Sequence, residues 1–148
     1  MKYPELAIEK CPCCNRDFGG IKTFEGFMAR LLVQCVKISS SDFLAAKDIK
    51  NKSYYARIAD LKYWNLLYQL PEWNHYGKYS VTRKAKDFLK GEIEIPVAAY
   101  VYNGECKKFS HETISFRKAM GKEFFEIEDW LNDWKNFTYQ PDGQRSFL

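Results

Sequence analysis

Residues 77–91 read GKYSVTRKAKDFLKG, and this stretch decides the fold. Its first part alternates apolar and polar side chains, which predicts a strand at 78–81. Thr82 follows as a suitable N-cap for a helix over 83–90. Gly91 comes just past the end of that helix, where glycine commonly terminates it. The stretch therefore predicts a strand that leads directly into a short helix.

The stretch before it, residues 53–67, reads SYYARIADLKYWNLL and carries apolar side chains at helical spacing. Ser53 is a suitable N-cap, which predicts a helix through about Tyr68. Pro71 is expected to end that helix or a short strand after it. Residues 72–77 are then expected to form a loop between the helix and the strand.

Two more helices are expected further toward the N-terminus. Apolar residues recur at i, i+3, i+4, i+7 and i+8 over 23–37, which predicts an amphipathic helix with Thr23 as its N-cap. Ser41 is the expected cap of a second helix over 42–49. Three helices, a hairpin and a further helix form the skeleton of a winged helix-turn-helix. We expect this core to occupy residues 21–96.

Beyond Gly91 the hydrophobic period changes from 3.6 to 2. Residues 93–97 alternate in the manner of an edge strand. A second strand is expected at 98–102, and the Asn103-Gly104 turn should return the chain into a third strand at 105–109. This part of the chain therefore predicts a β-hairpin attached to the core.

The end of the chain predicts a further strand at 113–116 and an amphipathic closing helix over 124–134. The expected fold class is α+β, with a zinc-type cysteine segment before the winged helix and a β-hairpin plus helix after it. The expected segments are a cysteine-motif segment at 1–20, a winged-helix-like core at 21–96, a hairpin and closing helix at 97–136, and a tail at 137–148.

Composition and charge narrow the function classes. The chain has 148 residues, of which 46% are hydrophobic and 28% charged, so it can bury a core. Residues 44–90 hold ten basic and four acidic side chains, whereas residues 91–148 hold seven basic and ten acidic ones. This distribution indicates one polyanion-facing surface. Because the sequence has no long apolar run and a polar N-terminus, we expect no membrane span, no signal peptide and a cytoplasmic location.

Two parts of the sequence resemble winged-helix regulators of the antibiotic-resistance and phenolic-acid-repressor types. The helical stretch at 53–67 resembles their helix that ends in a Trp/Gly-Leu-like step. Residues 77–88 resemble their aromatic strand, threonine and short helix. Ala85 departs from this pattern, because the commoner regulators carry glycine there. The resemblance implies a winged-helix fold.

A closer resemblance, over roughly residues 10–130, is to small uncharacterised proteins of phages and prophages. Those proteins open with a Cys-Pro-x-Cys-x-Arg motif, which the segment from Cys11 to Arg16 is similar to. They continue with a Phe-x-x-Gly-Glu-Ile-x-x-Pro segment, which matches Phe88 to Pro96. This resemblance implies a phage-related origin and a small accessory role, and it implies no established activity.

The cysteines indicate a structural zinc site. Cys11 and Cys14 have the spacing of half a zinc knuckle, since two thiolates in a tight turn can approach one ion at tetrahedral angles. Cys106 and His111 are the expected third and fourth ligands. Cys35 lies on an apolar helical stripe, where a buried free thiol is the simpler interpretation. The remaining alternatives for these two ligand positions are Cys13 and His75.

The basic middle of the chain predicts a DNA-binding surface. The helix at 53–67 would be the recognition helix, and its N-terminal residues would meet base edges. Lysines at its entrance and basic residues around the wing would contact phosphates. The candidate nucleic-acid-binding residues are Lys47, Lys50, Lys52, Tyr54, Arg57, Lys62, Lys78, Arg83 and Lys84.

Two other function classes compete with DNA binding. An enzyme is not expected, because the sequence has two histidines and lacks a phosphate-binding glycine loop or a recognisable nucleophile motif. The alternative is a phage protein that binds and inhibits a host protein, such as a defence or replication factor. The acidic end of the chain fits this alternative, since acidic helices can dock basic partners. This acidic end includes Glu123, Glu126, Glu128, Asp129 and Asp133.

Overall fold

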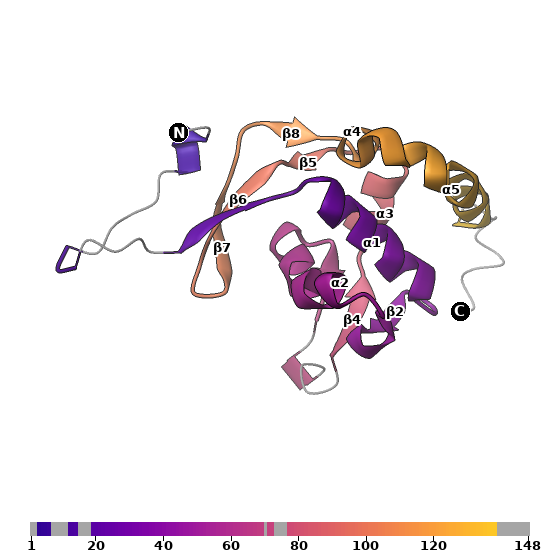
Figure 1. The fold of residues 1–148 in the computed structure, drawn as a ribbon, viewed down its shortest axis with the longest axis horizontal. Coiled ribbons are helices and arrows are strands. Elements are labelled where there is room, and N and C mark those ends of the chain that lie inside the picture. Colours follow the sequence, from indigo (N-terminus) through magenta and orange to yellow (C-terminus); the bar gives the residue numbers. More distant parts are fainter. Residues whose placement is uncertain (1–2, 7–11, 15–18, 70, 73–76, 139–148) are drawn as a thin grey trace.

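The computed structural model describes residues 3–6, 12–14, 19–69, 71–72 and 77–138 and shows a mixed α+β fold (Figure 1). The chain forms both helices and short antiparallel strands, which confirms the α+β class. The helical elements are η1 (Pro4–Leu6), α1 (Gly26–Ile38), η2 (Ala46–Asp48), α2 (Lys52–Arg57), η3 (Ile58–Trp64), α3 (Arg83–Leu89), α4 (Phe116–Met120), η5 (Gly121–Glu123) and α5 (Phe124–Thr138).

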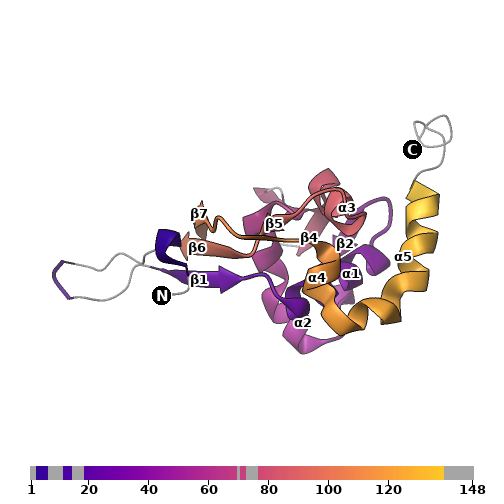
Figure 2. The ribbon, with the colours of Figure 1, turned by 90° about the horizontal axis from the view of Figure 1, so that it is seen from above.

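The strands form three small antiparallel sheets, with the orders β2-β4-β3, β1-β6-β7 and β5-β8. Figure 2 shows β1, β6 and β7 at one end of the molecule and α5 at the other. The strands are β1 (Gly20–Thr23), β2 (Phe43–Ala45), β3 (Leu67–Tyr68), β4 (Lys78–Val81), β5 (Ile95–Pro96), β6 (Ala98–Tyr102), β7 (Glu105–Phe109) and β8 (Thr113–Ile114).

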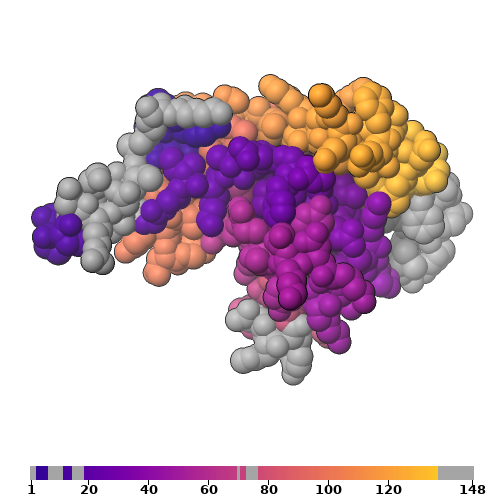
Figure 3. Space-filling view, viewed as in Figure 1, coloured from indigo at the N-terminus to yellow at the C-terminus, as the bar shows by residue number. Residues whose placement is uncertain are grey.

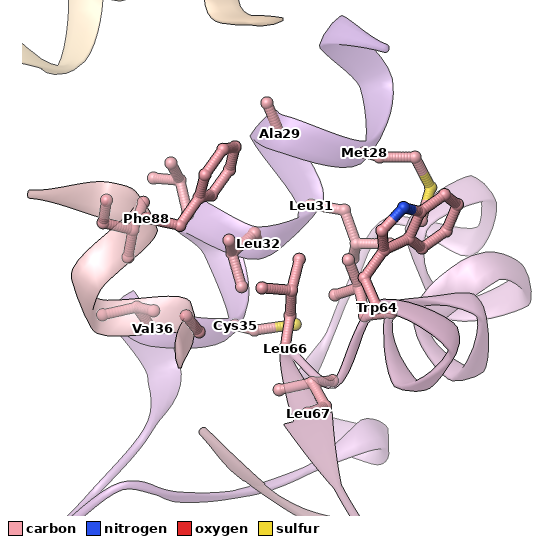
Figure 4. Close-up of a cluster of buried hydrophobic side chains, with 14 of the residues drawn as sticks. Met28, Ala29, Leu31, Leu32, Cys35, Val36, Trp64, Leu66, Leu67 and Phe88 are labelled. Carbon is pink, nitrogen blue, oxygen red and sulfur yellow. The ribbon is translucent and has the colours of Figure 1, made fainter. Parts of the chain in front are cut away.

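One main hydrophobic core joins the two halves of the chain. Phe24, Trp64, Phe88 and Phe116 are at most 1% exposed, and they come from four separate parts of the chain. The Phe24 ring meets the Trp64 and Phe88 rings edge-on at 5.6 and 5.5 Å, and Phe88 meets Phe116 at 5.7 Å. Edge-to-face geometry is the favoured one for aromatic pairs. Figure 4 shows the apolar face of α1 directed into this core.

A smaller cluster attaches the N-terminus to the second sheet. Tyr3 and Leu6 of the η1 region are buried against Val97, Ala98 and Tyr100. These residues pack apart from the main core, so η1 covers one side of β6. Burial of this apolar surface stabilises a segment that is too short to fold alone.

The helix expected over 23–37 exists but begins later. Residues 20–23 form β1, which pairs with β6 from Gly20↔Val101 to Thr23↔Ala98, so Thr23 belongs to a strand and caps nothing. The N-cap of α1 is Glu25, and its side chain makes no capping hydrogen bond. Pairing with a distant strand therefore overrides the local helical pattern here.

The prediction of a helix over 42–49 is wrong. Ser41 and Asp42 have positive φ angles of 51° and 69°, which turn the chain away from a helical path. Residues 43–45 then form β2 against β4, and only the 3-10 turn η2 follows. Hydrogen bonds to β4 satisfy this backbone in place of helical ones.

The helix expected from Ser53 to Tyr68 is correct in its first part. Its N-cap is Asn51, whose Oδ1 accepts hydrogen bonds from the backbone N–H groups of Ser53 and Tyr54 at 2.9 and 3.2 Å. The α-helix ends at Arg57 and continues as the 3-10 helix η3. Asn65 then adopts a left-handed conformation with φ of 60°, and Tyr68 lies in β3.

The decisive stretch at 77–91 is confirmed. Residues 78–81 form β4, and Thr82 Oγ1 accepts a hydrogen bond from the backbone N–H of Ala85 at 3.1 Å as the cap of α3. Gly91 follows this helix with φ of 80°. The turn at Asn103 and Gly104, both with positive φ, also forms as expected between β6 and β7.

The rest of the C-terminal half matches the expected pattern in part. Of the strand expected over 93–97, only Ile95–Pro96 is paired. The strand expected over 113–116 stops at Ile114, because Ser115 caps the unexpected helix α4 by accepting a hydrogen bond from Lys118 N–H at 3.2 Å. The closing helix is confirmed as α5, which includes the first two residues of the expected tail. Residues 139–148 lie outside the described chain.

Candidate nucleic-acid interface

The α2–η3 segment is fixed to the core along one face. The buried face of η3 consists of Ile58, Leu61 and Trp64. The indole Nε1 of Trp64 donates a hydrogen bond to the carbonyl oxygen of Pro96 at 2.8 Å. The exposed residues of α2 lie on the other side. Figure 3 shows this segment, in magenta, on the face of the molecule that is drawn, and Tyr54 of α2 lines a pocket together with Met120 of α4 and Ile127 of α5.

Three of the predicted lysines surround the start of α2. Lys47 lies on η2, Lys50 lies in the connection, and Lys52 is the first residue of α2, and all three are exposed. Within 44–57 the chain carries one carboxylate, Asp48. The start of α2 therefore has a local excess of positive charge, and a phosphate backbone would be attracted to it.

Tyr54 and Arg57 are partly withdrawn from this surface. The Tyr54 ring packs edge-on against Phe27 at 5.2 Å, and the Arg57 guanidinium lies 5.9 Å from the same ring. Arg57 Nε also donates a hydrogen bond to Asp60 Oδ2 at 2.6 Å, and Lys22 Nζ lies 3.8 Å from that oxygen. Both residues therefore hold α2 against α1, whereas Asp60 links η3 to β1 through Lys22.

Lys62 connects η3 to the sheet that contains β3 and β4. Its Nζ donates a hydrogen bond to Gln69 Oε1 at 2.9 Å and lies 5.9 Å from the centre of the Tyr79 ring. Gln69 Nε2 in turn donates to the carbonyl oxygen of Lys78 at 3.2 Å. Burial raises the pKa of Tyr79, so its phenol stays neutral beside the lysine.

The remaining predicted contacts lie around β4 and α3. Lys78 is the exposed first residue of β4, and Arg83 is the exposed first residue of α3. Lys84 is half-buried. His75, which belongs to the expected wing, lies outside the described residues. Exposed basic residues therefore lie in two places, at the start of α2 and around β4 and α3.

The first pair of zinc candidates is described only in part. Cys14 belongs to an exposed turn formed with Pro12 and Cys13, whereas Cys11 lies outside the described residues. Cys35 is a buried free thiol, as expected, and burial raises its pKa to about 12. Within the described part of the chain, no three His, Cys, Asp or Glu side chains gather in a way that could hold a metal ion.

The second pair of zinc candidates lies at opposite ends of β7. Cys106 is its second residue, while His111 follows its end, and an extended strand rises about 3.3 Å per residue. Cys106 is half-buried, and its Sγ donates a hydrogen bond to the carbonyl oxygen of Lys108 at 3.4 Å. His111 is exposed, and its backbone N–H donates to Glu5 Oε2 at 2.8 Å. The zinc site stays a prediction.

A cleft that the sequence did not predict separates η3 from the β6–β7 turn. Its volume is about 610 Å³. Burial raises the pKa values of Tyr63 and Cys106 on its walls, and a protonated thiol is a poor nucleophile. Its walls come from distant segments, so no local motif marks it. The lining residues are Ala59, Lys62, Tyr63, Asn65, Gly104, Glu105, Cys106 and Phe109.

The outer face of α5 is acidic and partly apolar. Phe124 and Leu131 are buried against the core, whereas Phe125 is 71% exposed. Among the five acidic residues considered above, Glu126, Asp129 and Asp133 are exposed and Glu128 is half-buried. Glu123 accepts a hydrogen bond from Arg30 Nη1 at 2.6 Å, so that carboxylate ties α1 to η5.

Comparison with protein-family models, curated proteins and solved structures found no match to this chain. Within the described residues, no helix has both the length and the apolar character needed to cross a membrane. The function must therefore be inferred from the arrangement of this chain's own residues.

Proposed function

We propose that this protein binds duplex DNA through a winged helix-turn-helix formed by the segment from α1 to β4. The order of elements supports the proposal: α1, β2, η2, α2–η3, β3 and β4 follow one another as helix, strand, helix, helix, strand and strand. The sheet order β2-β4-β3 places the first strand beside the last. In this proposal the α2–η3 segment would take the place of the recognition helix, and the paired strands β3 and β4 would take that of the wing.

The charge around α2 is the observation that carries the proposal. Lys47, Lys50 and Lys52 are exposed at the start of this segment, and Lys78 and Arg83 are exposed around the sheet. These side chains would contact phosphates and set the position of the protein on the duplex. Arg57 and Lys62 already bind protein groups, so we assign them a positioning role and expect them to reach DNA only by leaving those partners.

The biological role is proposed to be that of a small accessory or regulatory protein of phage type. This part of the proposal is supported by the resemblance of the cysteine motif and of the segment from Phe88 to Pro96 to phage and prophage proteins. Binding, rather than catalysis, is the proposed activity. A structural zinc held by Cys11 and Cys14 would stabilise the N-terminal segment, and metal analysis of a Cys11→Ser variant tests it.

Charge reversal tests the duplex-binding surface. Lys50→Glu combined with Lys52→Glu should weaken binding to a labelled duplex at least about tenfold, because repulsion replaces two phosphate contacts. The matched control is Lys118→Glu combined with Lys122→Glu, which makes the same change in charge at exposed positions of α4 and η5. An equal loss of affinity in both double variants would show that binding depends on net charge alone. That result would contradict the assignment of the binding surface to α2.

A second candidate function is binding to a basic host protein through α5. The exposed Phe125 beside Glu126, Asp129 and Asp133 favours it, since an apolar anchor among carboxylates suits a basic partner surface. The test is a pull-down from host lysate with the wild type and with a Phe125→Ala, Asp129→Lys variant. A partner that binds both proteins equally would exclude this face.

A further inference from the structure

The register of the first sheet places two exposed aromatic residues in one row. Phe43 on β2 and Tyr68 on β3 are both paired with Ser80 on the central strand β4. Residues paired across neighbouring strands project from the same face of a sheet. The alternating neighbours Leu44 and Tyr79 are buried in the core. Phe43, Ser80 and Tyr68 therefore lie together on the outer face.

The two aromatic side chains are each 52% exposed. Neighbouring strands lie about 4.8 Å apart, so the backbones of Phe43 and Tyr68 are separated by roughly 10 Å. Ser80, between them, carries only a small side chain and is partly exposed. Exposed aromatic residues on the face of a sheet are surfaces on which unpaired nucleobases stack.

The charge beside this row suits a phosphate backbone. Lys78 is paired with Ala45 and lies two residues from Ser80, so it projects from the same outer face and is exposed. Asp42 directly precedes Phe43, and its carboxylate forms an ion pair with Lys86 Nζ at 2.6 Å. The negative charge next to the row is therefore compensated, while the lysine adds positive charge to it.

We propose that this outer face binds single-stranded nucleic acid, with unpaired bases stacked on Phe43 and Tyr68 and with Lys78 beside the backbone. Base pairs in a duplex already stack on their neighbours, so the rings can reach base faces only in an unpaired strand. The face shares Lys78 with the proposed duplex-binding surface, whereas Phe43 and Tyr68 are not part of that surface. The proposal therefore goes beyond duplex binding, and its two rings can be tested separately.

The test compares labelled single strands of about 20 thymidines or uridines with a duplex of the same length in fluorescence anisotropy. Phe43→Leu combined with Tyr68→Leu keeps apolar side chains and removes both rings. Single-strand affinity should fall about tenfold or more, since the variant loses both rings on which bases would stack. The matched control is Tyr102→Leu combined with Phe125→Leu, which removes exposed rings elsewhere and should bind as the wild type does.

Two results would overturn the proposal. One is absence of single-strand binding by the wild type at low salt, which would leave the face to a protein partner. The other is equal binding by the wild type and the Phe43→Leu, Tyr68→Leu variant. Tyr68→Phe keeps the ring and should bind normally, which separates stacking from a structural effect. Duplex binding should not change in the Leu variant, so the two proposals fail independently.

Discussion

Trp64 Nε1 donates a hydrogen bond to the carbonyl oxygen of Pro96 across 2.8 Å and so joins the last turn of η3 to β5. The indole is fully buried and packs against Phe24. This contact connects the segment proposed to read DNA with the C-terminal half of the chain. The α2–η3 segment is therefore held by the main core at its C-terminal end.

Replacing this indole should destabilise the fold. Trp64→Phe keeps an aromatic ring but removes the donor, which leaves the Pro96 carbonyl unsatisfied and opens a small cavity. We expect the free energy of unfolding to fall by about 2–4 kcal/mol. Urea titration followed by circular dichroism measures it. Trp130→Phe, at a half-buried stacked pair on α5, should cost clearly less, and an equal loss would contradict the role given to the hydrogen bond.

The capping residue of α2 gives a second prediction. Asn51→Ala removes an acceptor of two backbone N–H groups and should cost about 1 kcal/mol of stability. Ser53→Ala should be neutral or stabilise slightly, because Ser53 is exposed inside the helix and alanine has the higher helix propensity. Thermal unfolding of both variants tests the order. A larger loss for Ser53→Ala would restore the N-cap predicted from sequence.

The Arg57–Asp60 pair gives a third prediction. The Asp60 side chain is only 14% exposed, so Arg57→Ala leaves a carboxylate with Lys22 as its more distant cation at 3.8 Å. We expect a loss of about 1 kcal/mol. Adding Asp60→Asn should recover part of it, because the unpaired charge is then removed. A double-mutant cycle by urea titration measures the coupling, and strict additivity would show that the pair contributes nothing.

The buried thiol of Cys35 predicts a pH dependence of stability. Burial raises its pKa to about 12, whereas an exposed thiol has a pKa of about 8.5. Between these values the unfolded chain loses the proton and the folded chain keeps it, so stability is full below about pH 8.5 and falls as the pH rises. Cys35→Ala should be less stable at neutral pH and show a shallower fall from pH 8 to about 10.5. An equal fall of stability with pH in the wild type and in Cys35→Ala would contradict the claim that Cys35 is a buried, protonated thiol.

Sequence patterns correctly predicted those helices and turns whose conformation depends on residues close together in the chain. Thr82 caps α3 through its own side chain, and Asn103-Gly104 forms the turn between β6 and β7 with positive φ angles that these residues tolerate. The apolar stripe of α5 also predicted a helix correctly. In each case a few neighbouring residues decide the conformation.

Strand pairing between segments far apart in the sequence explains most of the wrong predictions of secondary structure. Residues 20–23 become β1 only because β6 lies beside them, and residues 43–45 become β2 only because β4 does. Such pairs leave no periodic signal within a single short segment. The candidate site shows the same limit, since the partners of Arg57 and Lys62 follow from three-dimensional packing. The basic character of the α2 region, in contrast, was visible in the composition.

The most direct test of the central claim is the salt dependence of duplex binding, measured by fluorescence anisotropy on the wild type and on Lys50→Ala, Lys52→Ala. Phosphate contacts should make the logarithm of the affinity fall linearly with the logarithm of the salt concentration. Loss of two contacts should make that slope shallower by about two units. Absence of binding at low salt, or the same slope in both proteins, would contradict a DNA-binding surface at the start of α2.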